Sequence, residues 1–504
     1  MSYRLQLLLT TILALLAATC NKDLSIPPDT FTPPSRLDLV APAAVLNNSL
    51  VPIVLEESEH DFYITSDVSG TVTLQSTHAT LRESKLNMKK GRGSLTTRIS
   101  GTGKTHLSVV GESSSREINV LESFPVNTYR GSLIETHVVW DASVEHHITQ
   151  NLIIPEYTEL RIQAGTRVVL HETVNLEVYG TLVIEGTREQ PVWFTSAEAA
   201  PWGGLEFHNT KAHISYCFFT QGGGDASRVH GHSNSQAVVL AEKSNLVLDH
   251  CYFIDNVGKA VGGMHSRVSI DNCLISRCDT GGETHQSRVH ISNTHILEIP
   301  NDDDTFVDDD NDGFYVASHL PENDDPSRIE NCVIYAGKDD AIDHNLAKLE
   351  IHHCWLEGFA HEGVAGSNGN FVRVFNTVVK DCEQGIEAGY TEPQVFVDHC
   401  VIVNNKVGLR FGDSYKREHN GHMTVTNTIL FNNEDNIWNY SLLTESAVPG
   451  AIDISYSLTN DAEYDSATGC LSGTPLFDRN YYLKSSSPGK GAASDGSDMG
   501  LVPK

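Results

Sequence analysis

Basic residues are scarce in this 504-residue sequence: 35 Lys and Arg stand against 65 Asp and Glu, a formal net charge of −30. Nucleic-acid binding needs a basic surface, so this balance argues against it. An acidic surface instead suits solubility, divalent cations or neutral partners. An anionic glycan would need local Lys and Arg side chains or a bridging metal ion.

Three further features are absent, and each absence excludes a class of protein. Without regularly spaced leucines, a leucine-rich horseshoe is disfavoured. Without a CxxC pair, a zinc site or a thioredoxin-type redox site has little support. Beyond residue 18 no apolar run is long enough to cross a bilayer, so we expect any membrane attachment to be through a lipid.

The first 20 residues have the pattern of an export signal. Arg4 is followed by an apolar run and then by Ala17-Ala-Thr-Cys20, which resembles the bacterial lipobox. This resemblance implies a signal peptide over residues 1–19, lipidation of Cys20, and anchoring in the bacterial cell envelope, at the outer membrane or cell surface. An ordinary secretory peptide is the alternative. Residues 20–35 are Pro-rich and predict an extended tether.

A short phrase returns through the second half of the chain: Asn or His, then Cys or Thr, then branched apolar residues. It occurs at His250-Cys251, Asn272-Cys273, Asn293-Thr294, Asn331-Cys332, His353-Cys354, Asn376-Thr377, His399-Cys400 and Asn427-Thr428. A period of about 22 residues predicts stacked coils of short strands, a parallel β-helix. We expect the Cys/Thr position to face inward and the Asn/His position to occupy a bend, where Asn tolerates unusual backbone angles.

The ten cysteines fit this interpretation as small buried side chains. Neighbours in an inward column would lie about 4.8 Å apart with parallel Cβ vectors, which is a poor arrangement for a disulfide. We therefore expect free, buried thiols.

Residues 36–122 have a different pattern, with short alternating strands separated by Gly, Ser and Asn. Several strands at roughly 10-residue spacing predict an immunoglobulin-like β-sandwich. It contains no catalytic constellation, so a spacer or a binding module is expected.

The chain from residue 129 onward resembles a known family. Trp202-Gly-Gly-Leu, Ile214-Ser-Tyr-Cys and the closing Asp498-Met-Gly-Leu are similar to the first and last coils of bacterial right-handed parallel β-helix repeat proteins, which are pectate-lyase-like. The resemblance implies an all-β protein, with the sandwich followed by a right-handed single-stranded parallel β-helix over residues 123–504. Because the family mixes polysaccharide lyases, hydrolases, epimerases and adhesins, it implies a polysaccharide partner without fixing an activity.

One outward column of the predicted coils concentrates chemically active side chains. Strand alternation aligns Glu283, Tyr315, Asp343, Ala365, Glu387, Arg410 and Trp438, and the preceding bends add Asp339, Asp340, His361, Glu362, Glu383 and Lys406. Asp343 and Glu387 would lie two coils apart, roughly 9–10 Å, which suits the acid and base of an inverting glycosidase. Arg410 and His361 would orient the substrate. Glu283, Tyr315, Trp438 and Lys406 would bind it.

An acidic insertion lies beside this column. Asp308, Asp310 and Asp312 precede Gly313, as alternate carboxylates do at the start of a calcium loop, and Asp339 and Asp340 would complete the ligand set for Ca²⁺. His319 stands where an EF-hand needs Glu, so a complete EF-hand is excluded. A solvated acidic loop is the alternative.

A second insertion carries His230, His232 and Asp225. These residues could hold a transition metal, but a polar surface loop is the simpler interpretation. The leading hypothesis is thus an envelope lipoprotein that binds polysaccharide and cleaves it. A lyase with Arg410 or Lys406 as base, and a non-catalytic adhesin or scaffold, are the alternatives.

Overall fold

The structure, a computed structural model, describes residues 37–58, 63–197, 199–300, 310–322, 324–412 and 416–503. Its regular elements are the strands β1–β45 and two short 3₁₀ turns, η1 (Tyr63–Thr65) and η2 (Ala462–Tyr464). The all-β prediction is confirmed. Among these residues, no helix is long and apolar enough to cross a membrane.

Residues 37–121 form two small sheets with mainly antiparallel pairing; only β2 and β9 pair in parallel. The first sheet contains β1 (Leu37–Val40), β3 (Ser49–Glu57), β7 (Arg92–Ser100) and β5 (Thr80–Leu81). The second contains β2 (Ala44–Leu46), β9 (Ser115–Leu121), β8 (Gly103–Val109), β4 (Gly70–Ser76) and β6 (Lys85–Met88). The boundary at residue 122 and the immunoglobulin-like topology remain predictions.

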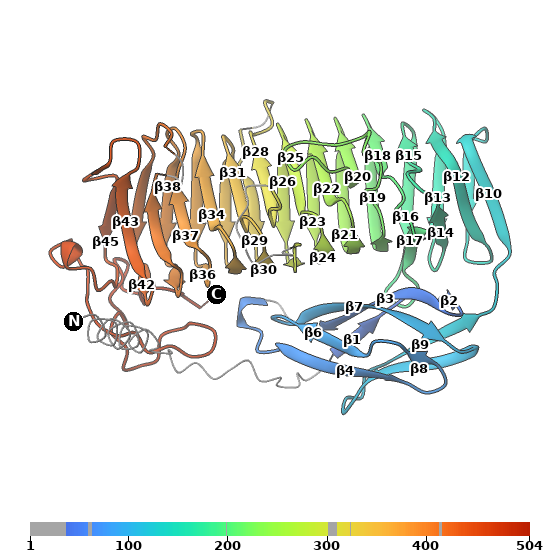
Figure 1. Cartoon of the computed structure of the whole chain (residues 1–504), viewed down its shortest axis with the longest axis horizontal. Coiled ribbons are helices and arrows are strands. Elements are labelled where there is room, and N and C mark those ends of the chain that lie inside the picture. Colours follow the sequence, from blue (N-terminus) through green and yellow to red (C-terminus); the bar gives the residue numbers. More distant parts are fainter. Residues whose placement is uncertain are drawn as a thin grey trace, which may run out of the picture. The chain divides into compact units, whose positions relative to one another are not determined.

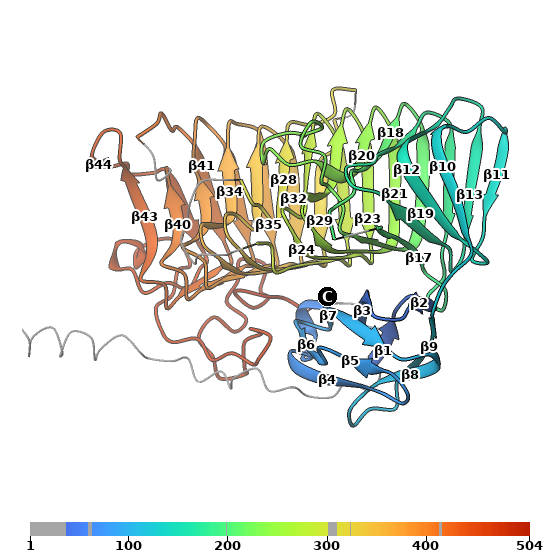
Figure 2. The same ribbon diagram turned by 45° about the vertical axis from the view of Figure 1, so that its right-hand side comes forward.

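The rest of the chain winds into coils whose strands stack in three parallel sheets (Figure 1, Figure 2). From β22 to β39, each strand pairs with the third strand after it, so one coil contributes one strand to each sheet. Sheet I contains β15 (Leu176–Val178), β18 (Leu205–His208), β20 (Ala237–Glu242), β22 (Lys259–Met264), β25 (Gly282–His285), β28 (Phe314–Ala317), β31 (Ile342–Asn345), β34 (Glu362–Ser367), β37 (Gln384–Ala388), β40 (Val407–Phe411) and β43 (Asp435–Ser441), which also pairs with β44 (Ser446–Ala447).

Sheets II and III follow the same rule. Sheet II contains β11 (His137–Trp140), β13 (Glu159–Gln163), β16 (Thr181–Glu185), β23 (Arg267–Asp271), β26 (Arg288–Ser292), β29 (Ser327–Glu330), β32 (Lys348–His352), β35 (Phe371–Phe375), β38 (Gln394–Asp398), β41 (His422–Thr426) and β45 (Ile452–Ser455). Sheet III contains β14 (Arg167–Leu170), β17 (Val192–Ser196), β24 (Leu274–Cys278), β27 (His295–Leu297), β30 (Val333–Gly337), β33 (Trp355–Phe359), β36 (Val378–Lys380), β39 (Val401–Val403) and β42 (Ile429–Phe431).

Four long strands bend and serve two sheets each. They are β10 (Val126–Ser132) and β12 (Glu145–Ile154), shared by sheets III and I, and β19 (Lys211–Thr220) and β21 (Asn245–Asn256), shared by sheets II and III. The side chains turned inward from all three sheets form one continuous apolar core, which sets the register of every coil.

The repeated phrase has the predicted geometry. All eight Asn/His positions of the phrase have a positive φ, between 49° for Asn376 and 56° for His353. The following Cys or Thr faces inward, and its side chain accepts a hydrogen bond from the backbone of the preceding coil, as from Cys273 N to Thr294 Oγ1 (3.2 Å) and from Cys354 N to Thr377 Oγ1 (3.2 Å). The column therefore links neighbouring coils along the axis.

The cysteine prediction is also confirmed for the described part of the chain. All nine of its cysteines are free, and eight are buried. Burial raises the pKa of Cys382 and of Cys400 to about 12, so these thiols are unreactive. Cys20, the predicted lipidation site, lies outside the described residues.

Residues of the N-terminal sheets contact the coils beside sheet III. Arg92 Nη1 donates to the carbonyl oxygens of Cys273 (3.1 Å) and Asn293 (2.8 Å). Lys89 Nζ lies 2.8 Å from Glu357 Oε2. These contacts occupy sheet III, so the outward side chains of sheets I and II are the more accessible places for a ligand.

Candidate functional site

The pairing register of sheet I aligns the predicted outward column. Glu283 pairs with Tyr315, Tyr315 with Asp343, and Asp343 with Ala365. Further along, Glu387 pairs with Arg410 and Arg410 with Trp438. The intervening pair Val364–Ile386 keeps the same offset, which places Ala365 beside Glu387. Residues more than 150 positions apart thus share one column because each sheet I strand pairs in register with the next, while the loops between strands differ in length.

An acidic cluster lies where the sheet I strands begin. It consists of Asp312, Asp339, Asp340 and Glu362, all buried, with the partly buried Asp343 and His361. Backbone bonds between coils bring these residues together: Glu362 N donates to Asp340 Oδ1 (2.7 Å) and Gly313 N donates to the Asp340 carbonyl (2.7 Å). Six side chains from three consecutive coils therefore meet at one place.

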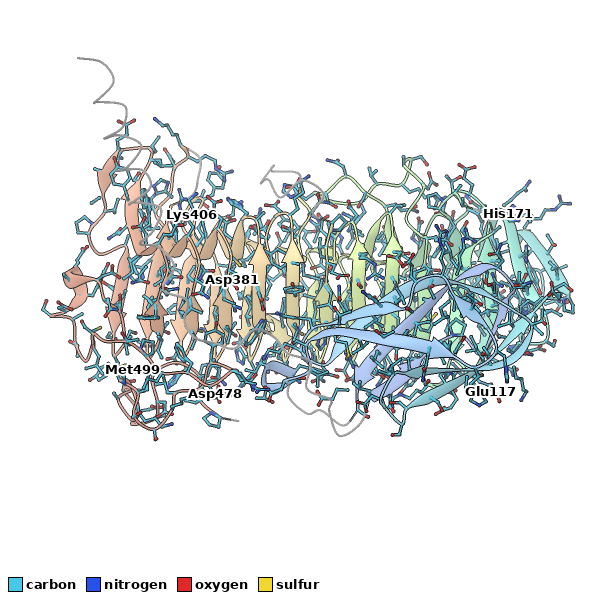
Figure 3. The ribbon with its side chains drawn as sticks, turned by 60° about the horizontal axis from the view of Figure 1, so that its bottom comes forward. Glu117, His171, Asp381, Lys406, Asp478 and Met499 are labelled. Atoms are coloured by element: carbon cyan, nitrogen blue, oxygen red, sulfur yellow. The ribbon has the colours of Figure 1, made fainter. Side chains whose placement is uncertain are left out.

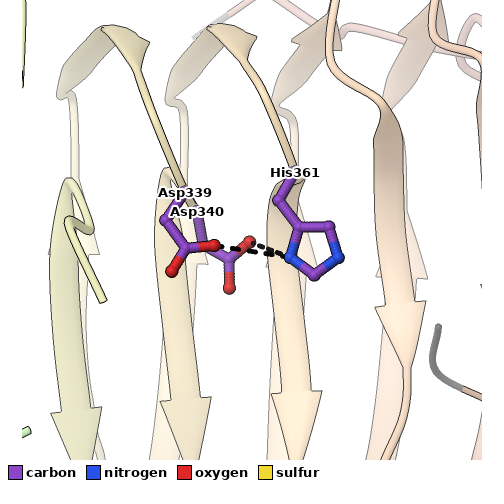
Figure 4. Close-up of side chains that lie close together, drawn as sticks. All are labelled: Asp339, Asp340 and His361. Carbon is purple, nitrogen blue, oxygen red and sulfur yellow. Dashed lines mark ion pairs between the residues drawn. The ribbon is translucent and has the colours of Figure 1, made fainter. Parts of the chain in front are cut away.

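His361 is the cation inside this cluster. Its Nδ1 lies 3.5 Å from Asp339 Oδ1 and 3.3 Å from Asp340 Oδ1, as Figure 4 shows, and it also contacts Glu362. Burial lowers the pKa of His361, but its interaction with Glu362 and its hydrogen bonds to Asp339 and Asp340 outweigh burial and raise the pKa well above its usual range. The imidazole is therefore held as an imidazolium.

The carboxyl groups divide into two classes. Burial, followed by repulsion from neighbouring carboxylates, raises the pKa of Asp312, Asp343 and Glu362 well above the usual range. Burial also acts on Asp340, but hydrogen bonds from Glu362 and His361 outweigh it and lower the pKa of Asp340. Several of these carboxyls therefore retain a proton where ordinary ones have lost it, as a general acid must.

Two groups within the cluster have metal-ligand spacing. Oxygen atoms of Asp312, Asp340 and Asp343 all lie within 4.8 Å of one another, and so do ligand atoms of Asp339, Asp340 and His361. The first group offers only carboxylate oxygens, which are the ligands that Ca²⁺ and Mg²⁺ prefer. It therefore fits a hard divalent cation.

The structure changes the ligand set predicted from the acidic insertion. Asp312 and Asp340 belong to the oxygen group, and Asp343 joins them. Asp310 lies 2.9 Å from His232 Nδ1 and is not among the metal-spaced groups of the described residues, so its role as a ligand stays a prediction. Asp308 lies outside the described residues.

Glu283 and Tyr315 lie under the loop between β19 and β20. The His232 ring stacks on Tyr315 with 5.1 Å between centroids, and the His232 backbone N–H bonds to Glu283. Glu283 is 1% exposed and paired with the fully buried Lys259. Although burial raises the pKa of Glu283, the bond from His285 and the charge of Lys259 lower it to about 2. Both residues therefore support the loop, and neither presents its side chain to a ligand in this conformation.

The far end of the column is more accessible. Arg410 and Trp438 are half-buried, and Trp438 lies edge-to-face with Tyr440 at 6.0 Å. Lys406, labelled in Figure 3, is exposed directly before β40 and pairs with Glu383. Glu387, between these residues and the acidic cluster, is buried.

The histidine-rich loop does not gather its predicted ligands. His230 is buried, His232 pairs with Asp310, and Asp225 accepts a hydrogen bond from Asn175 (2.8 Å). The metal-spaced groups found among the described residues include none of the three. Conversely, the sequence interpretation missed Gln384 and left Glu362 without a role, although Gln384 donates a hydrogen bond to Glu362 beneath His361.

Comparison with known proteins agrees with this architecture. Residues 204–364 match the family described as right handed beta helix region. The fold is a right-handed parallel β-helix. The predicted resemblance to proteins of this fold is thereby confirmed. No curated protein is similar enough in sequence to count as a match.

Solved structures with a β-helix give low similarity. Pectate lyase Pel9A is 11% identical with a TM-score of 0.35, covering 68% of this chain and 88% of that one. The A-module of the Azotobacter vinelandii mannuronan C-5 epimerase AlgE4 is 10% identical with a TM-score of 0.28, covering 69% and 91%. An alginate lyase from a Paenibacillus species is 13% identical with a TM-score of 0.23, covering 55% and 91%. At this level of similarity they do not indicate an activity.

Proposed function

We propose that the outward face of sheet I from Asp312 to Trp438 binds polysaccharide and hydrolyses it. The observation that carries the proposal is the alignment in one column of Asp343, whose pKa is raised by burial and by neighbouring carboxylates, with Glu387, Arg410 and Trp438. Two carboxyl groups on one face, one of which keeps its proton, can provide the acid and the base for glycoside hydrolysis.

Asp343 is the proposed acid and Glu387 the proposed base. They lie two rungs apart with the small Ala365 between them, a separation of roughly 9–10 Å at the spacing of parallel strands. Asp343 would donate its proton to the glycosidic oxygen while Glu387 takes a proton from a water that attacks the anomeric carbon. The C–O bond breaks, the water oxygen bonds to carbon, and two hydroxyl groups result.

Substrate contacts would come from the column beyond Glu387. The Arg410 guanidinium can hold a sugar carboxylate with two parallel hydrogen bonds, and the Trp438 indole offers a ring for stacking. His361, fixed by Asp339 and Asp340, would orient the acid. Because the cluster repels anions, an acidic glycan would be held mainly at the Arg410 end.

Asp312, Asp340 and Asp343 would hold a divalent cation, which would neutralise charge that is costly to bury. Asp343 cannot bind a cation and carry the catalytic proton at once. We therefore expect calcium to stabilise the protein and to suppress hydrolysis. If calcium instead proves essential for cleavage, the lyase alternative with Arg410 or Lys406 as base is favoured.

The test is release of reducing ends from a panel of acidic and neutral polysaccharides, in EDTA and in CaCl₂. We expect activity in EDTA that falls at least a hundredfold in Asp343→Asn and in Glu387→Gln, since each loses one proton-transfer group. Glu434→Gln and Asp435→Asn change exposed carboxylates at the start of β43 and serve as matched controls. Equal activity in all four variants would refute the assignment. Glycan binding without cleavage would favour an adhesin or scaffold.

Envelope attachment is part of the same proposal. The Ala17-Ala-Thr-Cys20 motif supports lipidation at Cys20, which would place the site at the bacterial cell envelope. Metabolic labelling with a fatty-acid probe should mark the wild type and not Cys20→Ala; equal labelling of both would contradict it.

A further inference from the structure

Sheet II presents a regular outward face. From β23 to β41 nearly every strand alternates buried and accessible residues. The accessible positions form columns that run along the helix axis, because each strand pairs in register with its neighbour. This face is separate from the sheet I site, since the two sheets are formed by different strands of each coil.

Basic residues gather in two adjacent columns of this face. In the first column Lys211 aligns with Asn245, then Arg267, then Arg288, and Lys348 lies further along. In the second, His290 aligns with Arg328, then Glu350, then Arg373, then Phe396. We call the six cations the basic stripe: Lys211, Arg267, Arg288, Arg328, Lys348 and Arg373.

The stripe stands out because the chain as a whole is acidic, with 65 Asp and Glu against 35 Lys and Arg. Glu350 is the only acid within the two columns from β19 to β38, and Arg328 and Arg373 share it, at 2.7 and 3.3 Å. Acids on this face gather in the third column instead, at Asp249, Asp271, Glu330 and Asp398.

Part of the stripe is neutralised and part is not. The turn before β29 supplies Asp325 to Arg288 (3.2 Å) and Asp324 to Lys348. Within the described residues, Lys211 and Arg267 have no ion pair. Six cations thus face three carboxylates, and the side chains of Arg328 and Arg373 remain 44% and 50% exposed.

Aromatic rings lie at one end of the stripe. Arg373 Cζ sits 4.1 Å from the centroid of the Phe371 ring and 5.7 Å from that of Phe396. Phe396 is 38% exposed. An accessible ring beside a guanidinium can stack on a sugar while the guanidinium binds its carboxylate or sulfate.

We propose that the basic stripe is a second binding surface, which takes an anionic polysaccharide lying along the helix axis. Charge complementarity selects the ligand, because the stripe is a positive strip on a protein whose net charge repels polyanions elsewhere. Successive coils repeat at about 4.8 Å, so an extended polymer meets one cation after another. The ring of Phe396 selects a sugar over other polyanions. The proposal does not require the sheet I site to be catalytic.

The test is the affinity of the full chain for polygalacturonate, measured by biolayer interferometry at low and high salt. We expect Arg267→Gln, Arg288→Gln, Arg328→Gln and Arg373→Gln combined to weaken binding roughly tenfold or more and to flatten its salt dependence. A matched control replaces Lys85, Lys104, Lys416 and Lys484, which are exposed elsewhere, by Gln. An equal loss in both quadruple variants, or none in the first, would overturn the proposal.

Further arms separate the sources of binding. Phe396→Ala should weaken binding of polygalacturonate and leave binding of polyglutamate unchanged; an equal loss for both, or for neither, would overturn the sugar assignment. Tighter binding to phosphatidylserine vesicles than to polygalacturonate would also overturn it. If the quadruple variant of the stripe has a lowered melting temperature, the double variant Arg267→Gln, Arg288→Gln replaces it, and its affinity for polygalacturonate is compared with that of the wild type. Asp343→Asn should bind polygalacturonate at the basic stripe as tightly as the wild type. Binding at the stripe can therefore be tested whether or not the sheet I site hydrolyses polysaccharide.

Discussion

Removing divalent cations should make the stability of this protein depend on pH in a direction opposite to that of most acidic proteins. Asp312, Asp343 and Glu362 have folded-state pKa values raised by burial and by neighbouring carboxylates. In the unfolded chain the same groups titrate near 4. A raised folded pKa contributes stability below the unfolded pKa, and this stability is lost as the pH rises through the folded pKa.

The magnitude follows from linkage. Each unit by which a carboxyl pKa is raised corresponds to about 1.4 kcal/mol lost once the pH exceeds the folded value. A cation bound by Asp312, Asp340 and Asp343 displaces the protons of Asp312 and Asp343, and at a concentration one hundred times its Kd it restores about 2.7 kcal/mol. We therefore expect the melting temperature in EDTA to fall between pH 5 and pH 8, and calcium to raise it by a few degrees at pH 8.

The assay is thermal unfolding followed by circular dichroism, with and without CaCl₂, at both pH values. Asp340→Asn removes one carboxylate from the centre of the cluster and should abolish the calcium shift. Asp435→Asn, an exposed carboxylate on β43, should leave it unchanged. A calcium shift of the same size in both variants, or a melting temperature in EDTA that rises from pH 5 to pH 8, would refute the reasoning.

Three further predictions concern the scaffold. Lys259→Met should lower the free energy of unfolding by about 3–5 kcal/mol, because it removes the buried ammonium from the Glu283 carboxylate and leaves only His285 to pair with it; a loss below 1 kcal/mol in urea denaturation would contradict this. Asn376→Ala should cost about 2 kcal/mol, since Asn376 has a φ of 49° and exchanges hydrogen bonds of 2.9 and 2.8 Å with Val502; an unchanged unfolding midpoint would contradict it. Among the described cysteines, Cys470 alone should react with a thiol reagent in the native protein, because the other eight are buried; rapid labelling of Cys382, followed by mass spectrometry, would oppose this.

The fold was predictable because the repeat couples sequence to register. The Asn/His position needs a positive φ and the Cys/Thr position needs a small inward side chain. The two residues therefore show where each coil begins in the sequence. Once the start of each coil is known, the strand positions of neighbouring coils can be aligned, and Asp343, Glu387 and Arg410 then fall in one column. The same reasoning placed Glu283 and Tyr315 correctly in the column.

What could not be predicted depends on loops, because their path follows from contacts and not from period. The loop that covers Tyr315 carries His232, which pairs with Asp310. Burial of Glu362 beside His361 likewise follows from the stacking of coils. The sequence placed Glu362 in the bend beside His361 but did not give it a role, because its contact with His361 follows from packing.

The most direct test of the central claim is the stereochemistry of the first product, followed by proton NMR during hydrolysis in EDTA. Asp343 and Glu387 two rungs apart leave room for a water, so the account predicts inversion at the anomeric carbon. A product that retains its configuration, or an unsaturated sugar formed by elimination, would contradict it.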